Sequence, residues 1–278
     1  MQKQGTTPAK VDLYNRAYGN YGADLYCQIR VDTYGLDLGQ TSWVTTEESN
    51  EIPRLLAITA ASNVLEIGSG SGRYALQVAS TTGCRVVGVD VNQPGIHNAN
   101  ALAAEQNLAE RVQFEKCDAS QPLRFGDAVF DAVFSNDALC HIPGRDKLLQ
   151  ELYRVLKPGG RLLFSDALVI GGVISHKEIA ARSSIGYFLF SPPGENERLL
   201  EKIGFTVAAV KDTTANASLI SQRWRDARQQ RAEALMGIEG TENFEGLQRF
   251  LSMVDTLTSE RRLLRLLYLA KKTTGTAA

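Results

Sequence analysis

Apolar residues follow two alternating patterns between residues 47 and 167. Runs of five or six mostly apolar residues predict buried strands, at 63–67, 85–89, 112–116, 129–134 and 161–165. Apolar positions three and four apart predict helices before and between them, at 47–59, 73–81, 94–107 and 146–156. Thr45 or Thr46 is the expected N-cap of the first helix. This alternation indicates a parallel, doubly wound sheet, in which all strands end at one edge where ligands bind.

The pattern is looser on both sides of this stretch. Residues 1–47 are rich in tyrosine and glycine, and we expect short helices and turns that pack on the rest of the chain. Beyond residue 166 the sequence predicts loop and helix over 167–200 with a helix at 195–203, a strand at 205–210, two helices within 217–257 broken near Gly237 and Gly240, and a closing strand at 263–270.

Net charge and the length of the apolar stretches argue against two classes of binding partner, nucleic acids and membranes. The formal net charge of the 278 residues is −1 at pH 7. Nucleic-acid binders usually carry a basic excess that neutralises phosphates, so we expect no RNA or DNA partner. The arginine-rich stretch 221–234 is interpreted as a solvated helix face. The most apolar stretch, 162–174, is interrupted by Ser165 and Asp166 and is too short to span a bilayer, so we expect no membrane association.

Cysteines and histidines are scattered along the chain. The four cysteines form no C-x-x-C pair and lie at Cys27, Cys84, Cys117 and Cys140. The three histidines are equally isolated, at His97, His141 and His176, so no metal site is predicted. Unpaired cysteines, and a start (Met1–Pro8) without the apolar core of a signal peptide, favour a cytoplasmic location.

The informative motif follows the first predicted strand. It reads Glu66-Ile-Gly-Ser-Gly-Ser-Gly72, with glycine at 68, 70 and 72. Glycines allow a tight turn and a close approach of backbone to a ligand. The dinucleotide fingerprint G-x-G-x-x-G would place its third glycine where this chain has Arg73, which argues against an NAD-dependent oxidoreductase.

This arrangement resembles motif I of class I S-adenosylmethionine-dependent methyltransferases. The resemblance covers about residues 47–167, including Lys157-Pro-Gly-Gly160. It implies that the glycine loop and Glu66 lie at the methionine end of S-adenosylmethionine, that Asp90 accepts from both ribose hydroxyls, and that Asp118 accepts from the adenine amine. The residues expected at the cofactor are Glu66, Gly68, Ser69, Gly70, Gly72, Asp90, Val91, Asp118, Ala119 and Asn136.

The segment Ser135-Asn-Asp-Ala-Leu-Cys-His141 follows the fourth predicted strand. It resembles the S-x-D-A-x-x-H segment of small-amine methyltransferases, notably phosphoethanolamine and sarcosine/dimethylglycine N-methyltransferases, and natural-product sugar O-methyltransferases carry a related histidine. His141 is therefore the candidate base, or else it only orders the loop or caps the next helix. Asp166 could orient His141 or touch the substrate, or be a plain turn residue.

Several aromatic residues and one arginine are candidates for binding the acceptor. Tyr18, Tyr21 or Tyr26, with Trp43, could present ring faces to a substituted ammonium, or they could simply pack the N-terminal segment. Arg182 could pair with a carboxylate or phosphate of the substrate, or lie solvated on the surface.

We therefore expect one Rossmann-like α/β domain over 1–278, with a mostly parallel seven-stranded sheet and inserted helices. Residues 1–47 would form a lid, 48–170 the cofactor-binding core, and 171–278 the acceptor-side insert with the closing strands. The expected reaction is methyl transfer to a small-molecule amine or hydroxyl. The rivals are a carbon methyltransferase acting on a lipid, quinone or sterol, which the apolar residues of 167–190 would favour, and a non-catalytic cofactor-binding protein.

Overall fold

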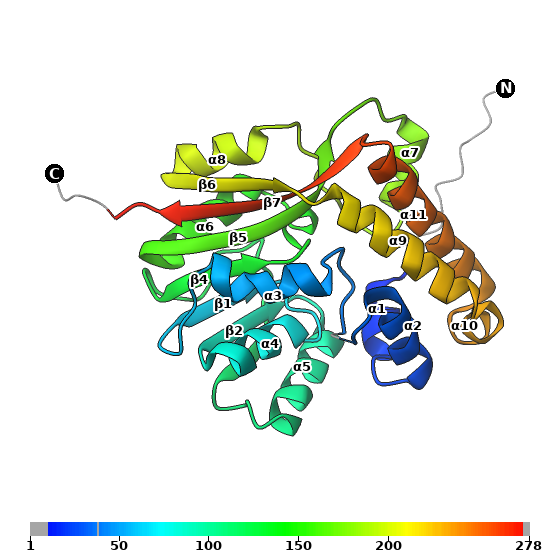
Figure 1. Ribbon diagram of the computed structural model, residues 1–278, viewed down its shortest axis with the longest axis horizontal. Helices are drawn as coiled ribbons and strands as arrows, with labels where there is room; N and C mark the ends of the chain where they lie inside the picture. The colour runs from blue at the N-terminus through cyan, green and yellow to red at the C-terminus, as the bar shows by residue number, and fades with distance from the viewer. Residues whose placement is uncertain (1–10, 38, 275–278) are drawn as a thin grey trace.

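The computed structural model describes residues 11–37 and 39–274, and its described strands form one seven-stranded sheet in the order β3-β2-β1-β4-β5-β7-β6 (Figure 1). Every adjacent pair is parallel except the two that β7 makes, which are antiparallel. The strands are β1 Asn63–Ile67, β2 Arg85–Asp90, β3 Val112–Lys116, β4 Phe130–Ser135, β5 Leu156–Ile170, β6 Phe205–Asp212 and β7 Leu263–Lys272. The predicted mostly parallel, seven-stranded sheet is confirmed. The amino-terminal stretch Met1–Pro8 lies outside the described residues.

The strand order reverses between β1 and β4. The chain winds outward from β1 through β2 to β3, then returns to place β4 on the other side of β1. In open sheets of this kind the crevice at such a switch point, beyond the carboxyl ends of the strands, is where ligands bind.

Helices cover both faces of the sheet, so its central strands β1 and β4 are buried on both sides, whereas the edge strand β6 is largely exposed. On one face Val64 packs with residues of α3 (Thr46–Leu55), α4 (Arg73–Thr82) and α5 (Gln93–Glu105). On the other, Leu65 packs with residues of α6 (Arg145–Val155) and α8 (Glu195–Ile203). Neighbouring positions on a strand point to opposite faces, which explains why these strands are apolar throughout.

The predicted elements between 47 and 165 all occur, with ends that differ by a few residues. Thr45 caps α3, because its hydroxyl accepts the N–H of Glu48 at 3.2 Å. The main error concerns β5, which we expected to end at 165. It continues to Ile170 because Val169 and Ile170 pair with the start of β7.

The region after β6 holds three helices rather than the predicted two: α9 Thr214–Gln229, α10 Ala232–Glu239 and α11 Thr241–Ser259. The break at Gly240 is confirmed, whereas Gly237 lies inside α10 and the break before Ala232 was not predicted.

The N-terminal segment packs on these inserted helices. Its own helices are α1 Tyr14–Gly19 and α2 Asp24–Tyr34. Figure 1 shows α1, α2, α9, α10 and α11 gathered at one end of the sheet, and side chains from α2, α9 and α11 share one apolar core. The short helix α7 (His176–Arg182) joins that core through α11. None of the helices in the described ranges is long and apolar enough to cross a membrane.

Candidate active site

A large cavity opens where β1, β2, β3 and β4 end. Its volume of about 720 Å³ lies within the range of pockets that hold drug-sized ligands. The strand ends contribute Gly68, Asp90, Asp118 and Asn136, and the facing wall comes from the N-terminal segment and residues 185–187. The cavity therefore lies at the switch point of the sheet and is closed by distant parts of the chain.

The loop after β1 runs close to its neighbours because three of its residues are glycines. Gly68 and Gly70 have φ angles of 75° and 51°, in the left-handed region. A Cβ on Gly68 would collide with the Cβ of Ala138, and a Cβ on Gly70 would lie 2.5 Å from the hydroxyl oxygen of Tyr18. Backbone can approach a ligand here only because these side chains are absent.

Two carboxylates line the cavity at the ends of neighbouring strands. Asp90 accepts the N–H of Gly70 at 2.8 Å and the N–H of Asn92 at 2.7 Å. These bonds fix the carboxylate and leave it further acceptor capacity. Burial raises the pKa of Asp90, because desolvation disfavours the charged form. Asp118 accepts the N–H of Ser120 at 2.9 Å.

Glu66 is fully buried beneath the glycine loop and lines no described cavity. Neither of its carboxylate oxygens has a hydrogen-bond partner of good geometry among the described residues. Burial raises the pKa of Glu66 well above its usual value; the backbone N–H of Ala75 opposes this shift and the charge of Asp90 adds to it. An unpaired buried carboxyl is costly, so a donor supplied by a ligand would stabilise it.

The other residues predicted for the cofactor divide between two cavities. Val91 and Ala119 line the large one beside Asp90 and Asp118. Ser69, Gly70 and Gly72 line a smaller cavity of about 40 Å³, which shares Gly68 and Asn136 with the large one.

His141 lies at the other end of the large cavity, in the turn η1 (Leu139–His141). Its Nε2 is 2.9 Å from the hydroxyl oxygen of Tyr14, and its Nδ1 is 3.1 Å from the carbonyl oxygen of Tyr187. The ring of Phe188 packs against the imidazole with centroids 4.3 Å apart. Two distant segments, one with Tyr14 and the other with Tyr187 and Phe188, therefore hold the histidine.

These contacts fix the protonation state of His141. A carbonyl oxygen only accepts, so Nδ1 carries the hydrogen. Burial lowers the pKa of His141 to about 4; the bond to Tyr187 opposes this shift, and the nearby Arg182 guanidinium adds to it. The imidazole is therefore neutral at pH 7, and the lone pair of Nε2 accepts a hydrogen bond from the Tyr14 hydroxyl. A neutral imidazole whose Nε2 lone pair accepts from an exchangeable hydroxyl beside a cavity can act as a general base.

Asp166 lies away from the cavity, so its position does not support the predicted catalytic role. It is fully buried, neither lines the cavity nor contacts His141, and forms an ion pair with Arg145 at 2.8 Å. Its remaining partners are the side chains of Ser191 and Asn196 and the N–H of Leu168. Asp166 thus lies within β5, and its carboxylate is used in structural contacts.

Of the four aromatic residues expected at the acceptor, Tyr18 is the one that lines the large cavity. Its hydroxyl lies 3.2 Å from Thr41 Oγ1 and close to Gly70, which places it at the glycine loop rather than near His141.

Tyr21, Tyr26 and Trp43 do not line this cavity. The Tyr21 hydroxyl accepts from Arg73 Nε at 2.6 Å, and the Tyr26 hydroxyl donates to Glu239 at 2.7 Å. Trp43 packs in the helical core. These three residues attach the N-terminal segment to the molecule, so their predicted acceptor contacts are not supported by their positions.

Arg182 is buried rather than solvated, with 2% of its surface exposed. Its guanidinium lies 4.5 Å from the ring centroid of Phe188 and 5.1 Å from that of Phe250. Its Nη1 has no hydrogen-bond partner among the described residues, and burial lowers the pKa of the group. Phe188 contacts both Arg182 and His141, which brings a positive charge near the histidine without placing it on the cavity wall.

Sequence reasoning missed Tyr14 and Asp137, which both line the cavity. Both Asp137 oxygens are occupied: Arg265 Nε donates to them at 2.9 and 3.1 Å, and Ser165 Oγ and the N–H of Trp43 donate at 2.8 and 2.9 Å. Tyr14 is one of several N-terminal tyrosines, and no local signal distinguishes it from the others. Asp137 was part of the quoted motif, but its partner Arg265 lies 128 residues away.

Comparisons with known proteins agree with this geometry. Residues 65–164 match the family model described as a methyltransferase domain. The O-methyltransferase resE of Aspergillus sclerotiorum is 33% identical over 183 residues, which is 64% of this chain and 67% of that protein. The chain belongs to the family of S-adenosylmethionine-dependent methyltransferases. Another member of that family, the 27-O-demethylrifamycin SV methyltransferase of Amycolatopsis mediterranei, is 26% identical over 245 residues, covering 82% of this chain and 89% of its own.

The likeness of fold extends to a solved methyltransferase. The Haemonchus contortus phosphoethanolamine N-methyltransferase 2, in complex with phosphomonomethylethanolamine and S-adenosylhomocysteine, superimposes with a TM-score of 0.77 and 24% identity. The match covers 94% of this chain and 61% of that one. At this identity the comparison shows the fold alone.

The cofactor of the family fits the residues present. A ribose diol and an adenine amine are donors, and Asp90 and Asp118 are acceptors on the cavity wall. The buried carboxyl of Glu66, beside the backbone N–H of Ala75, keeps acceptor capacity for a donor at the methionine end of the cofactor. In the described part of the chain no three His, Cys, Asp or Glu residues gather closely enough to hold a metal ion.

Proposed function

We propose that this methyltransferase methylates a hydroxyl oxygen of a small molecule, with His141 as the general base. The observation that carries the proposal is the neutral imidazole whose Nδ1–H is donated to the Tyr187 carbonyl, so that the Nε2 lone pair is directed to Tyr14 at the cavity wall. Two relatives named as O-methyltransferase or 27-O-demethylrifamycin SV methyltransferase support an oxygen acceptor.

The chain's own residues would bind the cofactor, remove the proton of the acceptor hydroxyl, and align the reactants away from water. Asp90, Asp118 and the glycine loop would hold the cofactor, which when bound supplies an electrophilic methyl on sulfur. The acceptor hydroxyl would replace the Tyr14 hydroxyl at Nε2, and its proton would pass to that nitrogen as the oxygen lone pair forms the new C–O bond. The C–S electron pair leaves with sulfur, and the imidazolium returns its proton to solvent. Alignment and exclusion of water would supply most of the acceleration.

The ion pair between Asp137 and Arg265 favours a hydroxyl acceptor over an ammonium acceptor. Asp137 lines the cavity and precedes His141 by one turn, but its charge is neutralised by Arg265. Behind Phe188, Arg182 adds a buried guanidinium whose Nη1 has no hydrogen-bond partner among the described residues. A positively charged acceptor would gain little here, whereas oxygen that becomes negative as its proton leaves would be stabilised.

The remaining interpretations belong to the same proposal. Residues 1–47 would act as the lid of the cavity, since Tyr14, Tyr18 and Thr41 line it. Arg182 would act on the acceptor through its charge, and direct pairing with a substrate carboxylate or phosphate would require the 185–187 wall to move. The four cysteines are free, which supports a reducing compartment such as the cytoplasm. The near-neutral charge supports a small-molecule partner over nucleic acid or a membrane.

The test is a screen of phenols, macrolactones, sugars, small amines and sterols with the wild-type protein, detecting S-adenosylhomocysteine release and locating the new methyl group by mass spectrometry. We expect O-methylated products, and a loss of about 10²–10⁴-fold in kcat for His141→Ala with unchanged affinity for S-adenosylhomocysteine. N- or C-methylated products alone, or full turnover by His141→Ala, would contradict the proposal. Cofactor binding with no transfer to any acceptor would favour the non-catalytic alternative.

A further inference from the structure

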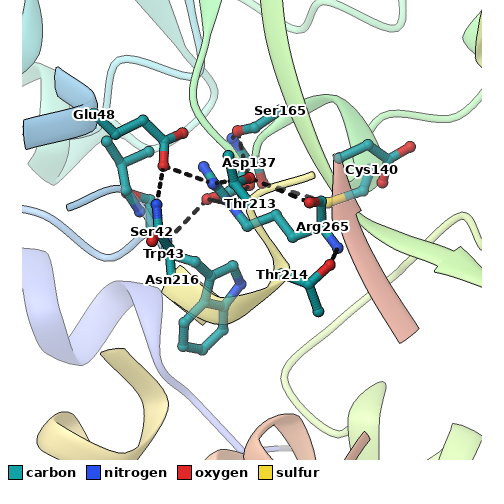
Figure 2. A network of polar contacts seen from close by, with 12 residues as sticks. Ser42, Trp43, Glu48, Asp137, Cys140, Ser165, Thr213, Thr214, Asn216 and Arg265 are labelled. Atoms are coloured by element: carbon teal, nitrogen blue, oxygen red, sulfur yellow. Dashed lines mark hydrogen bonds and ion pairs between the residues drawn. The ribbon is translucent and has the colours of Figure 1, made fainter. Parts of the chain in front are cut away.

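Arg265 on β7 joins four segments around the cavity (Figure 2). Besides its two bonds to Asp137, its Nη1 donates to Glu48 Oε2 at 2.9 Å and to Thr213 Oγ1 at 2.7 Å. The side chains of Arg265, Asp137 and Glu48 are 0%, 6% and 8% exposed. A guanidinium with several donors in a fixed plane can bridge two carboxylates in this way, and a lysine cannot reproduce the geometry.

Asp137 holds a turn that sets the path of the chain to His141. Its φ angle is 55°, a left-handed conformation that residues other than glycine rarely hold. The N–H of Asp137 donates to Ser165 Oγ at 2.9 Å, and its carbonyl accepts from Cys140 Sγ at 3.3 Å. The next residue, Ala138, lies against Gly68. The conformation is therefore over-determined by contacts, as strained positions at functional sites usually are.

The same carboxylate holds the opposite wall of the cavity. Its Oδ2 accepts the backbone N–H of Trp43 at 2.9 Å. Trp43 directly follows Thr41 and Ser42, which line both the large cavity and the smaller one at the glycine loop. Asp137 thus connects a wall of the cofactor end to the turn that carries His141.

We propose that Arg265 is a positioning residue for methyl transfer: by fixing Asp137 it locks the 41–43 wall and the 137–141 turn into one unit, so that His141 keeps its place relative to the cofactor. This proposal rests on the proposed function only in assigning the reaction to His141. The pair Arg145–Asp166 offers a matched comparison, because it is equally buried but does not line the cavity.

The test compares Arg265→Lys and Asp137→Asn with Arg145→Lys. We expect amide hydrogen exchange at Trp43 to quicken by about tenfold or more in the first two variants and to change less than about twofold in the control. We also expect kcat to fall by about 10–100-fold in Arg265→Lys with the KM of the acceptor nearly unchanged, and no further loss when Arg265→Lys is added to His141→Ala.

Each outcome decides the proposal. Wild-type exchange at Trp43 in both Arg265→Lys and Asp137→Asn would overturn it, as would a loss of kcat that multiplies with that of His141→Ala, since a purely structural role would act independently of His141. If Arg265→Lys fails to fold, Asp137→Asn carries the same exchange test with a nearly isosteric side chain. Amide hydrogen exchange can be measured without a methyl acceptor. If exchange at Trp43 changes as expected but the protein methylates no acceptor, the structural role of Arg265 is supported and the proposed function is refuted.

Discussion

The two ends of the large cavity are built in different ways. At the cofactor end, Gly68 follows β1, Asp90 ends β2 and Asp118 follows β3. The bonds that fix the two carboxylates come from Asn92 and Ser120, each two residues onward, and from Gly70 in the loop of the neighbouring strand, 20 residues before Asp90. At the acceptor end, the two nitrogens of His141 contact residues 127 and 46 positions away in sequence. The cofactor end is thus determined mainly by the strand ends and the loops that follow them, and the acceptor end by tertiary packing. Substitutions at the two ends should therefore affect cofactor affinity and turnover separately.

The largest effect is expected where the two ends touch. Gly68→Ala would drive a Cβ into Ala138 at a left-handed backbone position, so the glycine loop or the 137–141 turn must shift. We expect the affinity for S-adenosylhomocysteine, measured by calorimetry, to weaken by about 3 kcal/mol or more. Gly126→Ala is the control, because the nearest atom to the added Cβ among the described residues is Val129 Cγ2, at 3.7 Å. Wild-type affinity in Gly68→Ala would show that the two ends are not in contact.

The next effect is confined to the cofactor end. Asp90→Ala removes the acceptor assigned to the ribose hydroxyls, and we expect the affinity for S-adenosylhomocysteine to fall by about 1–3 kcal/mol. The rate at saturating cofactor should change little. Asp127→Ala, at a side chain that is 79% exposed and outside the cavity, is the control. Equal affinities for the two variants would remove Asp90 from the cofactor site.

A smaller effect is confined to the acceptor end. Tyr14→Phe removes the hydroxyl that donates to Nε2, and a lost hydrogen bond of this kind is worth about 0.5–1.5 kcal/mol. We expect kcat to change by up to about tenfold while the affinity for S-adenosylhomocysteine stays at the wild-type value. Tyr153→Phe, on α6 and away from the large cavity, controls for the loss of a hydroxyl. A selective loss of cofactor affinity in Tyr14→Phe would contradict this division of the cavity.

The smallest expected effect is that of pH. The pKa of His141 is lowered to about 4, so its neutral, basic form persists at all higher pH values. The rate should therefore be flat between about pH 5.5 and 8 and fall only as pH drops toward 4, whereas an unperturbed histidine would lose activity below about 6.5. For the same reason His141 opposes folding in acid: stability decreases as pH falls from about 6.5, because the unfolded chain binds the proton more readily. An inflection in the rate near pH 6.5 would contradict the burial of this imidazole.

The features predicted correctly from the sequence are those that depend on residues close together in the chain. The β1–glycine loop–α4 unit, Asp90 at the tip of β2 and Asp118 after β3 follow from apolar periodicity and motif spacing, and α8 was predicted with the same bounds. These features depend on residues within a few positions of one another.

What sequence reasoning missed depends on distant partners. Asp166 was predicted at the end of the fifth strand, but it lies within β5, and its partners Arg145 and Asn196 come from other parts of the chain. The extension of β5 to Ile170 requires β7, which follows some ninety residues later in the chain, as the pairing with Leu263 shows. The selection of Tyr14 over Tyr21 and Tyr26 depends on how α1 packs, because all three tyrosines occur in a segment with little periodicity.

The central claim is that one cavity holds the cofactor at its strand-end side with the methyl-bearing sulfur directed toward His141. A crystal structure with S-adenosylhomocysteine bound tests it most directly. The account predicts ribose hydroxyls within hydrogen-bond distance of Asp90, adenine beside Asp118, and the sulfur facing the space between Tyr14 and His141. A ligand seated elsewhere, or a ribose turned away from Asp90, would contradict it.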